Sequence, residues 1–93
     1  MAPLLPRPQP GVIVQQQQEA WFLLDTEAGE VFTVNPTAAR IFSLCQSGET
    51  LEGAVQSLAR GLNVTGQEDA IREDVLSTVR TFQELGLCEP PAA

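Results

Sequence analysis

The side chains able to do chemistry in this chain are twelve carboxylates and two thiols, because the sequence contains no His, no Lys and no Tyr. General acid–base catalysis near neutral pH relies mostly on His, or on a perturbed Lys, Tyr, Cys or carboxylate. A nucleophilic thiol also needs a base, and Cys45 falls on an apolar helical stripe, where burial is expected to raise the pKa of its thiol. We therefore expect no catalytic residue and no enzyme.

Cofactor and metal chemistry are not indicated either. Cys45 and Cys88 lie far apart without Cys-x-x-Cys spacing, and we interpret both as small buried apolar residues that a cytosolic compartment keeps reduced. Four carboxylates near the start of the third predicted helix lack the spacing of a calcium loop, and we interpret them as a solvated face favoured by the helix dipole: Glu68, Asp69, Glu73 and Asp74. No glycine-rich loop followed by Lys occurs.

Length and charge limit the partners. The chain has 93 residues, 43% of them hydrophobic, which suits one small globular domain. Its formal net charge of −7 repels nucleic acids and anionic membranes. There is no signal-peptide apolar segment and no apolar run of the ~20 residues that span a bilayer. We expect a cytoplasmic protein that binds neither nucleic acid nor membrane.

The elements begin after a proline-rich segment. Residues 1–10 contain four prolines and are expected to form a flexible arm, residues 11–88 the domain, and residues 89–93 a tail. Two β-rich runs, 12–14 and 20–24, are expected to pair across the glutamines, and a third strand over 31–34 follows a turn at Gly29. These strands predict an antiparallel sheet.

Three helices are predicted to follow. Asn35 and Pro36 form a favourable helix start, Thr50 can cap the second helix, and the third is expected from about Gln67 to Leu85 after a loop over 62–66. Their apolar stripes are Ala38, Ile41, Phe42 and Cys45; then Leu51, Ala54, Val55 and Leu58; then Ile71, Val75, Val79 and Phe82. The predicted class is α+β, with a three-stranded sheet followed by three helices.

Three segments of this pattern resemble the PqqD-like family, which comprises recognition elements and chaperones of ribosomally made, modified peptides. They are the strand-to-helix corner 29–42, the turn 48–52, and the last helix with its glycine, 74–87. The resemblance covers about residues 11–88 and implies a winged-helix-like arrangement. Val34 stands where the family usually has Leu, and Thr78 where it often has an aromatic residue.

The resemblance implies a peptide-binding function. In the family, the leader segment of a precursor peptide adds as a strand to the third strand and lies between it and the third helix. The implied peptide-binding residues here are Val31, Phe32, Thr33 and Val34 on the strand, and Ile71, Arg72, Val75, Leu76 and Val79 on the helix, although Val75 and Val79 fit a place in the core equally well. Val31 and Thr33 are expected to border the peptide, while Phe32 and Val34 face the core. Arg72 could reach a carboxylate on the leader.

The resemblance also implies a partner enzyme, and two other functions stay open. The implied partner is a modifying enzyme such as a radical SAM protein or an HPr kinase-related protein, and the chain would be a monomer or a weak dimer paired through its sheet edge. Two alternatives stay open: a structural scaffold subunit of an enzyme complex, and a winged-helix DNA-binding regulator. The acidic start of the third helix argues against the regulator.

Overall fold

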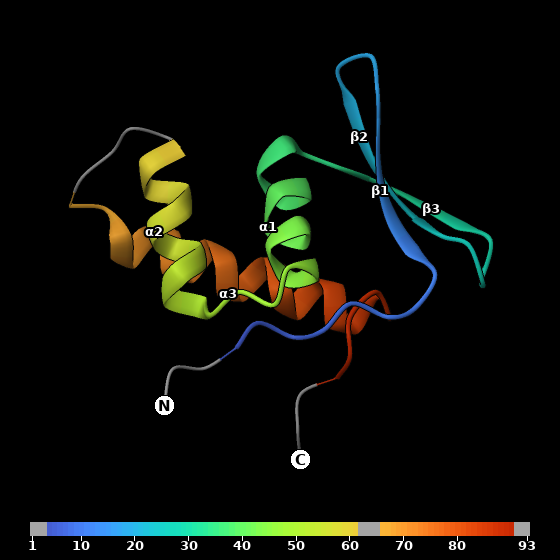
Figure 1. Ribbon diagram of the computed structural model, residues 1–93. Coiled ribbons are helices and arrows are strands. Elements are labelled where there is room, and N and C mark those ends of the chain that lie inside the picture. The colour runs from blue at the N-terminus through green and yellow to red at the C-terminus, as the bar shows by residue number, and fades with distance from the viewer. Residues whose placement is uncertain (1–3, 62–65, 91–93) are drawn as a thin grey trace.

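The computed structural model describes residues 4–61 and 66–90, which form a three-stranded sheet followed by three helices (Figure 1). The strands are β1 (Val12–Gln17), β2 (Ala20–Asp25) and β3 (Glu30–Val34), and the helices are α1 (Pro36–Gln46), α2 (Leu51–Gly61) and α3 (Glu68–Glu84). The predicted α+β class and element order are confirmed. Most of the predicted loop over 62–66 and the outermost residues of the arm and tail, 1–3 and 91–93, lie outside the described residues.

The sheet is an antiparallel meander in the order β1-β2-β3. A two-residue turn joins β1 to β2, with Gln17 opposite Ala20 and Gln18 at a φ of 57°. The turn from β2 to β3 is held by Asp25, whose Oδ1 accepts the amide hydrogens of Glu27 and Ala28 at 3.1 and 3.0 Å. Of the described strands, β1 and β3 form the two edges.

The predicted helix starts of α1 and α2 are confirmed. Asn35 Oδ1 accepts the Ala38 amide hydrogen at 2.7 Å, and Thr50 Oγ1 accepts that of Gly53 at 2.9 Å. The third helix is one residue shorter at each end than predicted. Gly86, at a φ of 77°, then turns the chain back so that Leu87 enters the core.

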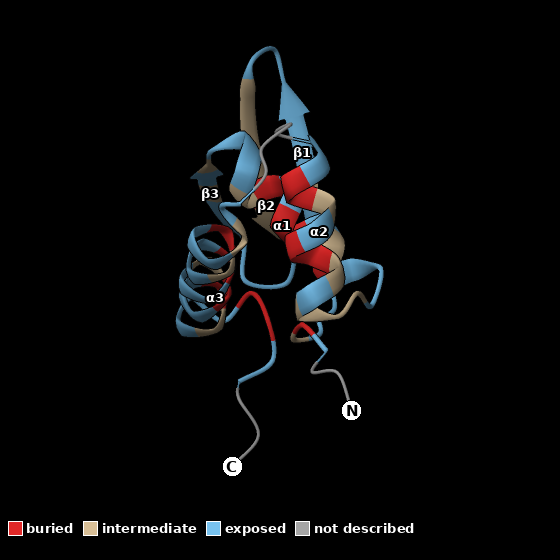
Figure 2. Cartoon of the chain, turned by 90° about the vertical axis from the view of Figure 1, so that its left-hand side faces the viewer, coloured by how far each residue is buried: buried red, intermediate tan, exposed pale blue. Residues whose placement is uncertain are grey.

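The core lies between the sheet and the helices, and Figure 2 shows the buried segments of α1 and α2 facing inward. Phe42 of α1 and Phe82 of α3 form an edge-to-face aromatic pair with ring centroids 5.3 Å apart. The predicted α3 stripe is buried throughout. On α1, Ala39 is buried and Ala38 only half-buried, because Ala38 lies beside β3 at the groove described below.

Residues 4–10 of the N-terminal segment, which was expected to form an arm, pack against the domain. Leu5 is buried, and its amide donates to the Glu49 carbonyl at 3.0 Å. The Gln9 amide donates to the Leu87 carbonyl, and the Glu89 amide to the Arg7 carbonyl, both at 2.9 Å. This segment therefore pairs with the chain after α3, because its non-proline residues still offer backbone groups and Leu5 supplies an apolar anchor.

Candidate functional site

The outer edge of β3 has backbone groups that the sheet does not use. In a two-residue hairpin the closing pair is hydrogen-bonded, so Gln17 and Ala20 set the alternation of the ladder. Ala20 and every second residue after it on β2 therefore hydrogen-bond to β1. Trp21 and every second residue after it hydrogen-bond to β3, where the partners are Val34, Phe32 and Glu30 in turn. The N–H and C=O groups of Val31 and Thr33 consequently point away from the sheet.

A groove of about 490 Å³ runs beside this edge, between β3 and α3. Figure 2 shows β3 and α3 on the same side of the molecule. Phe82 and Leu87 are buried at its base, whereas Val31 and Leu85 are 62% and 45% exposed. The described residues that line it carry no charge: Val31, Phe32, Thr33, Val34, Asn35, Ala38, Ser77, Thr78, Thr81, Phe82, Leu85 and Leu87. An unused strand edge thus borders an uncharged, partly apolar groove.

The structure places all four β3 candidates at this groove. Val31 and Thr33 are exposed, and Phe32 and Val34 are half-buried and pack against the core. Phe32 lies opposite the fully buried Leu23 of β2. The alternation expected from the sequence, with Phe32 and Val34 directed inward, agrees with this burial.

The five α3 candidates do not line the groove. Ile71, Val75 and Val79 are buried in the core with exposed fractions of 7%, 0% and 7%. Leu76 is 38% exposed but lies outside the groove lining, and Arg72 is engaged with carboxylates. The structure places these residues outside the helical wall of the groove, because the most apolar face of α3 packs onto the domain and only Phe82 of that face reaches the groove.

The helical wall consists instead of Ser77, Thr78, Thr81 and Leu85, with Phe82 beneath them. These residues form a stripe next to the core stripe: Thr78, Thr81 and Leu85 follow one another at three and four positions, and Ser77 lies four positions before Thr81, as one face of a helix requires. Sequence reasoning missed them because they are small and mostly polar. One signal was available: this stripe is uncharged, while the other exposed positions of α3 are mainly Asp, Glu and Arg.

Arg72 joins α3 to α2. Its Nε and Nη2 donate to the two carboxylate oxygens of Glu52 at 2.9 and 2.8 Å, and its Nη1 donates to Asp69 Oδ1 at 2.8 Å. The hydrogen bonds from Arg72 hold the pKa of Glu52 below its ordinary value, and those to Glu52 raise the pKa of Arg72. All three guanidinium nitrogens of Arg72 thus donate to carboxylates of this chain, and Arg72 does not line the groove.

Replacing Arg72 by Gln is expected to raise the pKa of Glu52 toward its ordinary value. A depressed carboxylate pKa stabilises the folded state above the pKa of the unfolded chain, and this contribution disappears as pH falls through the depressed value. The free energy of unfolding of the variant should therefore fall less than that of the wild type as pH is lowered through the pKa of Glu52. Carboxyl NMR titration of Glu52 checks this, with Arg80→Gln on the same helix as control. An unchanged Glu52 pKa in Arg72→Gln would contradict the assignment.

Cys45 and Cys88, distant in sequence, are both buried in the core, where each thiol shifts the pKa of the other. The Cys45 thiol raises the pKa of Cys88, and burial raises it further. For Cys45 the effect of the Cys88 thiol outweighs that of burial, so its pKa is lowered and not raised as burial alone predicts. The interpretation of both cysteines as buried is confirmed.

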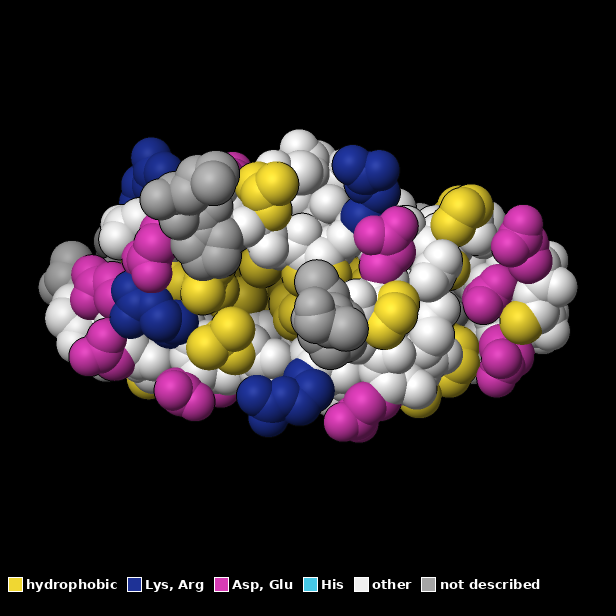
Figure 3. All heavy atoms as spheres, turned by 90° about the horizontal axis from the view of Figure 1, so that it is seen from below, with side chains coloured by type: hydrophobic (Ala, Val, Ile, Leu, Met, Phe, Trp, Pro, Cys, Tyr) yellow, Lys and Arg dark blue, Asp and Glu magenta, His cyan; other side chains and the backbone are white. Residues whose placement is uncertain are grey.

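Figure 3 shows the charged side chains on the face seen from below. The arginine side chains are separated from one another and form no continuous basic area on this face, and the charged side chains at its right-hand end are all acidic. Among residues 4–61 and 66–90, no three His, Cys, Asp or Glu side chains are grouped so that they could hold a metal ion. Within the same residues, no helix is long and apolar enough to cross a membrane.

Comparisons with known proteins found a matching family model and two similar solved structures. The family model described as coenzyme PQQ synthesis protein D matches residues 20–87. The structure of TbiB1 in complex with the TbiA(beta) leader peptide is 20% identical, with a TM-score of 0.76 over 94% of this chain and 99% of that one. Lasso peptide synthetase B1 complexed with the leader peptide is 26% identical, with a TM-score of 0.76 over 90% and 96% of the two chains. No curated protein matches the sequence.

Proposed function

The chain belongs to the PqqD family, and from this premise we propose that it binds the leader segment of a ribosomally made precursor peptide and presents it to a modifying enzyme. The observation that carries the proposal is the unused edge of β3 beside the β3–α3 groove. Two similar structures, both solved with leader peptides, support it. The receiving enzyme would be a radical SAM protein or an HPr kinase-related protein, in the cytoplasm.

Binding would proceed by strand addition. The outward N–H and C=O groups of Val31 and Thr33 can pair with an extended peptide and supply affinity that does not depend on its sequence. Alternate side chains of that peptide would then enter the groove toward Phe82 and Leu85. Because the lining is uncharged, selectivity would come from the size and shape of apolar side chains. The hydroxyl groups of α3 could meet the peptide's polar positions.

The direct test is an NMR titration of labelled protein with the leader peptide encoded by a neighbouring gene. Amide shifts are expected along 31–34 and along 77–85. Shifts confined to β1 or α2 would refute the proposed groove. The absence of any shift with every neighbouring leader, at concentrations well above micromolar, would refute leader binding itself.

Replacing Thr81 by Arg should block the groove without unfolding the domain. Thr81 is exposed and lines the groove, so a long charged side chain there would occupy the peptide's space while remaining compatible with a helix. We expect leader binding to weaken by about tenfold or more, equivalent to at least ~1.4 kcal/mol. Isothermal titration calorimetry measures this.

The matched control is Ala70→Arg, which adds the same charge at an exposed α3 position outside the groove lining. It should leave leader binding unchanged. Equal weakening in both variants would indicate a general effect of charge and would count against the groove.

A further inference from the structure

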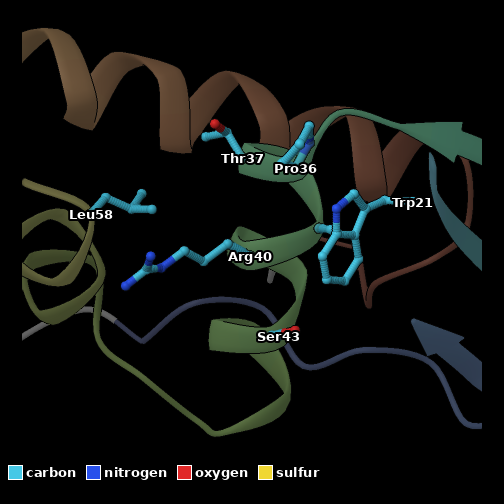
Figure 4. A pocket seen from close by; sticks show the side chains of 7 residues that line it. Trp21, Pro36, Thr37, Arg40, Ser43 and Leu58 are labelled. Carbon is cyan, nitrogen blue, oxygen red and sulfur yellow. The ribbon is translucent and has the colours of Figure 1, made fainter. Parts of the chain in front are cut away.

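A second concave site lies on the other side of α1. It is a notch of about 440 Å³ between the start of β2, the N-terminal half of α1 and the middle of α2. Figure 4 shows Trp21 on one side, Leu58 on the opposite side, and Arg40 extending from α1 between them. None of the residues that line the β3–α3 groove lines this notch.

The notch has apolar walls. Ala39 and Leu58, with exposed fractions of 1% and 3%, belong to the buried core and form part of its surface. Trp21 is half-buried, so part of its ring stays accessible beside them. A half-buried tryptophan with an indole N–H is the kind of side chain that protein interfaces favour, since it offers apolar area and one donor.

Arg40 gives the notch its charge. Its guanidinium lies against Gly61, the last residue of α2. The contact is close: a Cβ atom at Gly61 would lie only 2.7 Å from Arg40 Nη1. Among residues 4–61 and 66–90 the only ion pairs are those of Arg72, so Arg40 has no carboxylate partner there. An unpaired arginine beside apolar walls binds a carboxylate more strongly than one surrounded by water.

We propose that this notch is the docking site for a second protein, which inserts a segment carrying a carboxylate next to a large apolar side chain. The carboxylate would pair with Arg40, and the apolar side chain would pack on Trp21 and Leu58. The occupant is acidic by charge complementarity, since Arg40 is the one charged residue of the lining. The proposal rests on the proposed function, with the second protein being the one that receives the bound peptide.

The position of the notch favours a second protein over the leader peptide itself. Helix α1 separates the two sites, so both can be occupied at once. They approach each other at the start of α1, where Thr37 lines both the notch and a polar recess that shares Asn35 and Ala38 with the groove. A protein docked in the notch would therefore stand beside the Val34 end of the groove, where a bound peptide emerges.

The test uses a displayed library of random short peptides selected on the full chain. Trp21 is the only tryptophan, so its fluorescence reports occupancy of the notch. We expect a class of peptides with Asp or Glu beside a large apolar residue that shifts Trp21 emission. Arg40→Gln should weaken this class by about tenfold, as loss of a charge-assisted pair does. Arg60→Gln, at an exposed arginine outside the lining, should not.

The Thr81→Arg variant separates the two proposals. Notch peptides should bind it normally, whereas groove peptides should not. If groove peptides are found but none depends on Arg40, only the notch inference fails. If no selected peptide is sensitive to Thr81→Arg, the proposed function fails. Peptides sensitive to both Arg40→Gln and Thr81→Arg would show that one peptide occupies both sites, which overturns docking of a second protein.

Discussion

Replacing Thr33 by Pro is expected to weaken leader binding by about tenfold or more while costing little stability. The ladder alternation directs the Thr33 N–H away from β2, so proline removes a donor that the domain itself does not use. Its loss costs about 0.5–1.5 kcal/mol of a hydrogen bond, and the proline ring also obstructs an added strand. Calorimetric titration with the leader and urea unfolding measure the two effects separately.

The matched control places proline on the opposite edge. Gln16 on β1 has the same outward alternation as Thr33 but does not line the groove. Gln16→Pro should therefore leave leader binding unchanged. Equal losses of binding and of folding in Thr33→Pro would mean that this amide supports the sheet, and would place the peptide elsewhere.

Replacing Phe42 by Ala is expected to have the largest effect on stability. Phe42 is fully buried and packs edge-to-face on Phe82, so truncation opens a cavity at the contact between α1 and α3. Removal of a buried phenylalanine ring costs about 3–5 kcal/mol, a large part of the ~5–15 kcal/mol that stabilises a domain. The free energy of unfolding in urea should fall by this amount, and much of the protein should be unfolded at 37 °C.

Leu85→Ala provides the contrasting case. Leu85 is 45% exposed and lines the groove, so its truncation should change stability by less than about 1 kcal/mol while weakening leader binding. If Phe42→Ala cost no more than Leu85→Ala, the α1–α3 contact would not be the centre of the core.

Two neighbouring stripes of helix α3 contact different parts of the structure. Ile71, Val75 and Val79 hold the helix on the domain, and the neighbouring stripe with Ser77 and Thr81 faces the groove. A buried stripe fixes the rotation of the helix, and this rotation fixes which side chains face β3. Ile71, Val75 and Val79, which the resemblance implied for the peptide-facing wall, belong in the structure to the stripe that packs on the domain.

The sequence alone predicted the three strands, the three helices and the β3 side of the groove. Local signals specify them: the Asn35 and Thr50 caps, the period of 3.6 in α3, and the period of two in β3. Each depends on residues within a few positions of one another, so the sequence pattern carries the information directly.

The tertiary structure decided the features that join distant segments. It brought Cys45 to Cys88, Arg72 to Glu52, and residues 4–10 to the chain after α3. It also brought Trp21 to Arg40 across one notch. Such contacts depend on how the helices rotate and pack on the sheet, which is set by the fit of the whole core rather than by any local pattern.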